Sequence, residues 1–273
     1  MSNYFKKEFF ETLLILKNYL SDFVIAGGWA PLIYYHYLLS DKTREPLRTK
    51  DIDIVVPAHL KKRKDRTVDE ILTEAGFESQ FRSRHVPPVL SYEGKIGNFE
   101  VEIEFLTHRK GARDGQVAVV QEGLHAQLLR FIIILLENSI TVDIDDFKLK
   151  DNEFLKIRVP TPGAFIFQKG LIFTRRTTDE KKSKDLYYIF DILSNCEELK
   201  TQLLKDISNF KESYPLSWSK QFINNLKVYF PGVDGDGVLM VQSQKPENAY
   251  PDMNDEQFCQ YVFGIFQEFI DNL

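Results

Sequence analysis

Two aspartates, Asp51 and Asp53, interrupt an otherwise apolar run that ends at Pro57. The run from 49 to 56 is rich in β-branched residues, which favour strands, and proline is rare inside a strand. Successive side chains of a strand point to opposite faces, so both carboxylates must lie on one face and the intervening Ile52 on the other. The pattern predicts a strand with one acidic face and one apolar face.

A pair of glycines precedes this strand. An apolar run at 23–26, predicted as a short strand, ends at Gly27 and Gly28, and helical spacing begins at Trp29 and continues to Leu39. Glycine lets a phosphate approach the backbone closely, and the start of a helix offers free N–H groups. Neither GxxxxGK[ST] nor GxGxxG occurs here. We therefore predict that Gly27, Gly28 and Trp29 bind the phosphates of a nucleotide in a different way.

Paired carboxylates beside a phosphate-binding turn favour magnesium, which prefers oxygen ligands and retains several waters. A third carboxylate is expected on the strand 99–105, which alternates strictly and places Glu100, Glu102 and Glu104 on one face. A solvated strand face is the competing interpretation of these glutamates, most of all for Glu100. Only one of them needs to bind a metal ion.

Composition narrows the class of protein. The chain has 273 residues, 43% of them apolar, and a net charge of -5, which argues against a general nucleic-acid coat but permits a local basic patch. Cys196 and Cys259 are too few for a zinc site, and we expect a reducing, cytoplasmic setting. The N-terminal 20 residues predict an amphipathic helix, and the apolar stretch 131–136 is too short to span a membrane, so no membrane segment is expected.

The rest of the chain divides into a mixed part and a helical part. The spacing predicts further elements in the order helix 67–75, strands 78–82 and 88–92, a turn at 93–98, and a strand at 140–147. Residues 128–139 fit either a buried helix or a strand. Helices are expected near 163–175, 182–194, 197–213, 217–229 and 255–272, with a long polar connection at 231–251. We predict an α/β catalytic domain over 1–158 and a helical domain over 159–273 that packs against it to form a nucleotide cleft.

The segments AGGWA at 26–30 and KDIDIVV at 50–56 resemble the polymerase-β-like nucleotidyltransferase superfamily, in which a GG or GS turn opens a helix and hDhDh lies on the next strand. The resemblance implies a mixed sheet, an NTP substrate and two magnesium ions held by Asp51, Asp53 and a third acidic residue on a neighbouring strand. Glu104, within Ile103-Glu104-Phe105, matches that third position best, and Glu102 is the alternative.

The second half resembles a narrower group. The segments RVPTPGAFIFQKG at 158–170 and KDLYYIFDIL at 184–193 look like those of the abortive-infection nucleotidyltransferases, the toxins of type IV toxin-antitoxin pairs, and related bacterial proteins. The resemblance implies catalytic roles for Lys169 and Asp185, with Lys169 also contacting the nucleotide. Tyr188 stands where members of that group often have a further aspartate. Without the resemblance, Lys169 and the basic run that follows it would be interpreted as solvated helix residues.

The expected activity is magnesium-dependent transfer of NMP from an NTP to RNA, protein or a small molecule, in a bacterial toxin with an antitoxin partner. The alternative is a nucleotide-binding or toxin-antitoxin interaction protein that keeps the fold but has little catalytic activity. A second DxD motif, Asp143 and Asp145, has no glycine turn before it and is interpreted as an exposed strand end.

Overall fold

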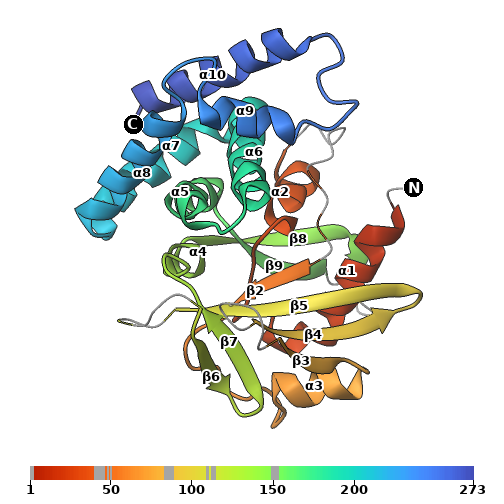
Figure 1. Cartoon of the computed structure of the whole chain (residues 1–273). Helices are drawn as coiled ribbons and strands as arrows, with labels where there is room; N and C mark the ends of the chain where they lie inside the picture. The colour runs from red at the N-terminus through yellow and green to blue at the C-terminus, as the bar shows by residue number, and fades with distance from the viewer. Residues whose placement is uncertain are drawn as a thin grey trace. The chain divides into compact units, whose positions relative to one another are not determined.

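The computed structural model describes residues 3–39, 47, 49, 51–82, 89–108, 111, 115–148 and 154–273. The chain forms two compact units. The N-terminal unit comprises residues 1–38 and 48–160, and the C-terminal unit comprises residues 39–47 and 161–273. In Figure 1, all the labelled strands and helices α1 to α4 belong to the first unit, and helices α5 to α10 belong to the second.

The N-terminal unit combines short helices with strands. Its elements are α1 (Asn3–Ile15), the 3₁₀ turn η1 (Lys17–Tyr19), β1 (Val24–Ile25), α2 (Trp29–Ile33), the π-helical turn η2 (Tyr34–Leu38), β2 (Asp51–Val55), α3 (Val68–Glu74), β3 (Glu78–Arg82), β4 (Val89–Ile96), β5 (Phe99–Thr107), β6 (Val117–Gln121), β7 (Leu124–Leu128), α4 (Ile133–Glu137), β8 (Ser139–Lys148) and β9 (Phe154–Pro160).

The main sheet of this unit is mixed. Its strands follow the order β1-β2-β5-β4-β3, and β7 pairs with both β5 and β6. The pairs β2–β5 and β5–β7 are parallel, whereas the other pairs are antiparallel. Strands β8 and β9 form a separate antiparallel pair. A mixed sheet followed by a helical unit confirms the predicted fold class.

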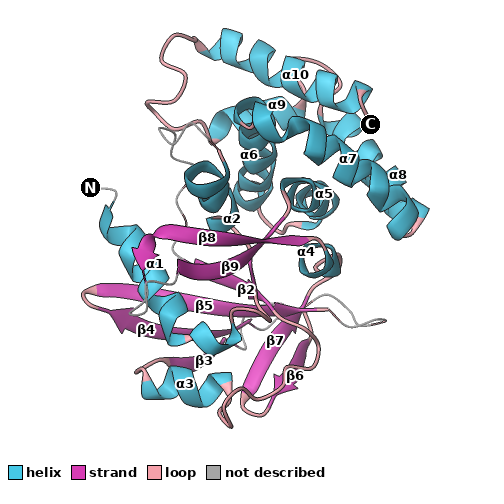
Figure 2. Ribbon diagram, turned by 180° about the vertical axis from the view of Figure 1, so that it is seen from behind, coloured by secondary structure: helices cyan, strands magenta, loops and turns pink. Residues whose placement is uncertain are grey.

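Alternation of side chains gives β2 and β5 one apolar face and one acidic face. Ile52 and Ile103 are paired across the parallel strands and are almost fully buried, while the acidic residues on either side of each isoleucine lie on the other face. Phe105 extends the apolar side, where its ring meets those of Phe23 and Tyr92 edge to face. Figure 2, which views the sheet from behind, shows α1 crossing β4 and β5.

The C-terminal unit is helical among the described residues. Its elements are α5 (Pro162–Ile172), the 3₁₀ turn η3 (Phe173–Arg175), α6 (Asp179–Asn195), α7 (Glu197–Ser213), α8 (Leu216–Tyr229), α9 (Asp236–Ser243) and α10 (Asp255–Asp271). Thr161, Thr178 and Asn254 cap three of these helices by accepting a hydrogen bond from the backbone N–H three residues later. In the part of the chain that the structure describes, no helix combines the length and the apolar character needed to cross a membrane.

Several elements differ from the sequence predictions. Helix α9 lies within the segment 231–251 that was predicted to be a polar connection, because Val238 and Val241 provide a small buried face despite the surrounding glycines. The predicted turn at 93–98 is confined to Gly97 and Asn98, since β4 continues to Ile96. Strands β6, β7 and β9 were not predicted. Residues 128–139, for which helix and strand both remained open, contain the single-turn helix α4.

Candidate functional site

The glycine pair lies against the second aspartate of the DxD motif. Gly27 has a φ of +58°, in the left-handed region that favours glycine. A Cβ atom at Gly27 would lie 2.9 Å from Cγ of Asp53 and closer still to its Oδ2. The backbone N–H of Ala26 also donates to the carbonyl oxygen of Asp53, at 2.9 Å. Glycine at position 27 is therefore required both by the backbone conformation and by the approach of the Asp53 carboxylate.

The acidic residues of β2 and β5 lie in register. Asp51 is paired with Glu102, and Asp53 is paired with Glu104, across the parallel pair. Neighbouring strands are about 4.8 Å apart, so each aspartate has a glutamate beside it on the same face. Asp51 is exposed and the other three carboxylates are half-buried. Like charges placed side by side destabilise a sheet, and a bound cation would offset that repulsion.

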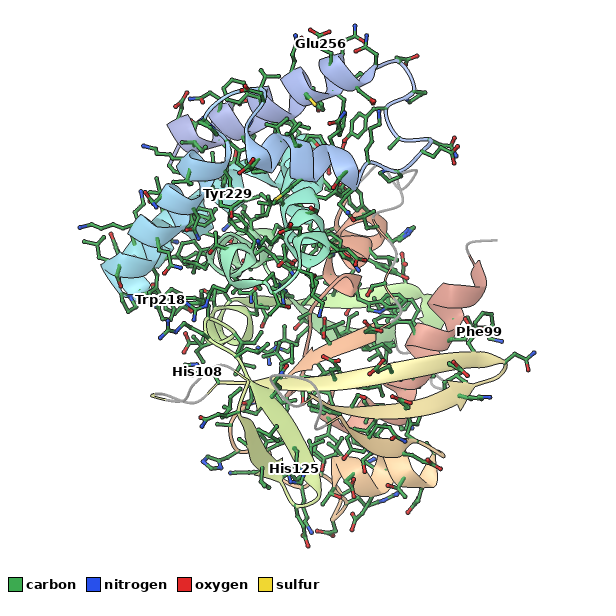
Figure 3. All side chains as sticks on the ribbon, in the orientation of Figure 1. Phe99, His108, His125, Trp218, Tyr229 and Glu256 are labelled. Carbon is green, nitrogen blue, oxygen red and sulfur yellow. The ribbon has the colours of Figure 1, made fainter. Side chains whose placement is uncertain are left out.

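The strand register places each of the two candidates for the third carboxylate beside a different aspartate. Glu104 is beside Asp53, the residue that Gly27 contacts, and Glu102 is beside Asp51. Glu100 faces Lys95 across the hairpin β4–β5 and forms an exposed, 4.0 Å ion pair with it. Figure 3 marks Phe99, which opens β5 at this end of the hairpin. Glu100 thus fits the solvated strand face that was predicted for it.

The donor set fits a hard divalent cation. The four carboxylates supply only oxygen ligands, which magnesium prefers, and they share one face of two adjacent strands. Within the described ranges, no three His, Cys, Asp or Glu side chains are already gathered closely enough to hold a metal ion. Shared binding of one ion by these residues therefore requires their side chains to rotate toward a common point.

Trp29 contributes to the core rather than to the surface. Its indole is 2% exposed and stacks on the ring of Phe9, with the ring centroids 3.7 Å apart. Its side chain is therefore not available to a nucleotide, and the predicted role of Trp29 in phosphate binding concerns its backbone N–H group. Gly28, which is buried, precedes it as the N-cap of α2.

Lys169 and Asp185 are brought together inside the C-terminal unit. Lys169 Nζ lies 2.6 Å from Asp185 Oδ1, and the two side chains are 9% and 4% exposed. Arg176 completes the group, because its Nε donates to Asp185 Oδ2 at 2.6 Å. Sequence reasoning placed Arg176 in a basic run without assigning it this partner. Its position nine residues before Asp185 gave no helical spacing from which the contact could be inferred.

The charge state of this cluster follows from its contacts. Burial of Asp185 raises the pKa of its carboxyl, but Lys169 and Arg176 outweigh that effect and hold the pKa below its ordinary value of 3.8. Asp185 is therefore ionised at neutral pH. Tyr188, at the position where the resemblance leads one to expect an aspartate, has its ring 5.7 Å from Lys169 Nζ. An aromatic face replaces a second carboxylate beside the lysine.

The second DxD motif is separate from these groups. Asp143 and Asp145 lie on β8 and are both exposed, and Asp143 forms a 3.9 Å ion pair with Lys156 on β9. The exposure of the motif agrees with its interpretation as solvated, but the two residues lie in the middle of β8 (Ser139–Lys148) and not at its end. His36 is half-buried in η2, with its ring centroid 6.3 Å from that of Tyr37.

Comparison with known proteins gives one family and one structural neighbour. A family model described as nucleotidyltransferase matches residues 17–210 of the chain. The crystal structure of an antigenic nucleotidyltransferase-like protein from Paracoccidioides brasiliensis is 19% identical in sequence, and the alignment covers 79% of this chain and 92% of that one with a TM-score of 0.40. No curated protein matches the sequence significantly. The matched range includes the glycine pair, the DxD motif, Glu104, Lys169 and Asp185.

Proposed function

Because this chain belongs to the nucleotidyltransferase family, we propose that it transfers NMP from an NTP to an acceptor in a magnesium-dependent reaction. The observation that supports this most directly is the register of β2 and β5. It places Asp53 between Gly27 and Glu104, and Asp51 beside Glu102, on one face of the sheet. A glycine with positive φ against a row of carboxylates suits the joint binding of phosphate and metal.

Asp51, Asp53 and Glu104 are the residues that would hold magnesium. When bound, the ions would neutralise charge on the triphosphate oxygens and favour displacement at the α-phosphorus. The backbone of Gly27 and Gly28 would approach the triphosphate, because neither residue has a side chain to keep it away. An acceptor oxygen would form a bond to the α-phosphorus as the bond to the β-phosphate oxygen breaks, and pyrophosphate would leave.

The proton of the acceptor hydroxyl requires a base. Glu104 is our candidate because it lies beside Asp53 in the register and is half-buried, so it can be close to both the metal-binding residues and the acceptor. A carboxylate in hydrogen-bond reach of the hydroxyl accepts the proton as the new P–O bond forms. Glu102 is the alternative for the same role, because it lies beside Asp51.

Lys169 and Asp185 are proposed to contribute charge. In the described part of the chain, Asp185 pairs with both Lys169 and Arg176, and the role that we propose for Lys169 is to interact with a phosphate group. Lysine interacts with phosphate as a point charge, and the short contact with Asp185 would hold its ammonium group in one position. Asp185 would then act by orienting Lys169.

A labelled-transfer assay tests the proposal. The protein is incubated with each of the four NTPs, labelled at the α-phosphate, together with magnesium and either total RNA, total protein or a small polyamine. We expect label in one acceptor fraction and none after chelation of the metal. The variant Asp51→Asn/Asp53→Asn should abolish transfer, and Asp143→Asn/Asp145→Asn, which alters the exposed DxD motif of β8, should not.

Further measurements distinguish Glu104 from Glu102 as the base, and NMP transfer from nucleotide binding without catalysis. Glu104→Gln should reduce transfer much more than Glu102→Gln, and the reverse order would assign the role to Glu102. Transfer that survives in Asp51→Asn/Asp53→Asn would refute the proposed site. Magnesium-dependent NTP binding in calorimetry, without label in any fraction, would instead favour a nucleotide-binding interaction protein. Toxicity on expression, relieved by a neighbouring gene product, would test the proposed toxin role.

A further inference from the structure

Ser91 lies near the start of β4, on the strand next to the carboxylates of β5. Its side chain is 0% exposed. Its Oγ atom is buried, and none of the groups that the structure describes forms a hydrogen bond with it. A buried hydroxyl without a partner costs free energy that an alanine at the same position would not. Packing alone therefore does not explain why a serine occupies this position.

The strand register places this hydroxyl beside a predicted metal ligand. Ser91 is directly opposite Glu104 in the antiparallel pair β4–β5, and Glu104 is directly opposite Asp53 in the parallel pair β5–β2. Directly opposed residues of an antiparallel pair share a face, with Cβ atoms about 4.5–5.5 Å apart. Ser91, Glu104 and Asp53 thus form one row across three strands. Ser91 occupies the side of Glu104 that is away from Asp53.

We infer that Ser91 is a positioning residue for Glu104. Its hydroxyl donates a hydrogen bond to one carboxylate oxygen of Glu104 when that side chain turns to bind the metal ion, which leaves the other oxygen directed toward Asp53. Partners of this kind fix the orientation of a ligating carboxylate and raise the affinity of the site. Ser91 itself contacts neither the NTP nor the acceptor. The inference rests on the proposed function, because it requires Glu104 to bind the metal.

The inference makes a prediction that a packing role does not. Ser91→Ala removes a hydroxyl that has no hydrogen-bond partner among the described residues, so without added metal the variant should unfold at the same temperature as the wild type or slightly higher. Its affinity for Mn²⁺, measured by the electron paramagnetic resonance signal of the free ion, should fall about tenfold or more. The metal concentration that gives half-maximal transfer should rise by the same factor, while KM for the NTP at saturating metal stays unchanged.

Two further variants complete the test. Ser91→Thr retains the hydroxyl at a strand position that suits threonine, and it should restore Mn²⁺ affinity. Ser219→Ala is the matched control, because Ser219 in α8 is another buried serine whose Oγ lacks a hydrogen-bond partner among the described residues. It should change neither Mn²⁺ affinity nor transfer.

The outcomes distinguish this inference from the function on which it rests. Wild-type Mn²⁺ affinity in Ser91→Ala would overturn the inference, as would equal losses in Ser91→Ala and Ser91→Thr. A lower unfolding temperature of metal-free Ser91→Ala would also contradict it, because that result indicates an ordinary structural role. If the wild-type protein neither binds Mn²⁺ nor transfers label, the proposed function itself fails and the inference fails with it.

Discussion

Replacing Gly27 by alanine tests the contact at the centre of the candidate site. Two separate costs are expected. The backbone at φ +58° is unfavourable for any residue with a Cβ, by about 1–2 kcal/mol. In addition, the new Cβ would lie 2.9 Å from Cγ of Asp53, so the carboxylate must leave its rotamer, at a further cost of about 0.5–1.5 kcal/mol.

A matched substitution at Gly97 distinguishes the cost of the backbone conformation from the cost of the contact with Asp53. Gly97 has almost the same backbone angle, a φ of +59°, but a Cβ built there has no atom within 4 Å. Both glycines belong to the N-terminal unit, so the same unfolding transition reports on both variants. Gly97→Ala should show only the backbone cost, reduced by the smaller entropy of the unfolded alanine chain. Gly27→Ala should be about 1 kcal/mol less stable than Gly97→Ala.

Urea unfolding followed by circular dichroism measures the two free energies, provided that the m-values agree. In the background Asp53→Ala, only the Cβ of residue 53 remains, 3.2 Å from the new methyl group, and the extra cost of Gly27→Ala should largely disappear. Transfer activity should fall about 10–100-fold in Gly27→Ala, because the proposed metal ligand Asp53 is displaced, and not at all in Gly97→Ala. Equal destabilisation by the two substitutions, or an extra cost that persists without the carboxylate, would refute the close approach of Gly27 and Asp53.

Two predictions concern the stability of other parts of the chain. Asp185→Asn removes the carboxylate that pairs with the buried Lys169 and the half-buried Arg176 and should cost about 3–5 kcal/mol at neutral pH, measured by thermal unfolding. The pKa of Asp185 is held below 3.8 in the folded state. The ionised carboxylate therefore stabilises the fold above pH 3.8, and this contribution is lost as the pH falls through the lower pKa of the folded state. The unfolding temperature of the variant should fall less steeply with acid than that of the wild type. Thr67→Ala removes the capping box that Thr67 forms with Glu70 at the start of α3 and should lower the free energy of urea unfolding by about 1 kcal/mol, whereas an unchanged value would contradict the capping role.

The strands that carry the carboxylates were predictable because their signals are local. Alternation identified β2 and β5 and the face on which each acidic residue lies, and the glycine pair marked the turn before α2. The resemblance to the polymerase-β-like nucleotidyltransferase superfamily is confirmed by the family match over residues 17–210. The narrower resemblance to the abortive-infection toxins remains a prediction. The binding of magnesium and the nature of the acceptor are also predictions.

The elements that were missed differ in the strength of their local signals. β7 and β9 alternate between buried and more exposed residues, so alternation could have identified both, whereas β6 has only five residues and a less regular pattern. Helix α9 has only eight residues and begins beside Gly235 and Gly237, which favour turns. The burial of Trp29 was equally inaccessible, because it depends on Phe9 from a helix about twenty residues earlier in the chain.

The pairing of β2 with β5 illustrates the same limit at the candidate site. Alternation places Asp51 and Asp53 on one face of β2, and Glu102 and Glu104 on one face of β5, but a shift of the register by two residues would preserve both faces and change every pair. The observed register alone puts Glu104 between Asp53 and Ser91. An unpartnered serine therefore becomes informative only when the neighbour across the strand is known, and the choice between Glu102 and Glu104 depends on the same long-range pairing.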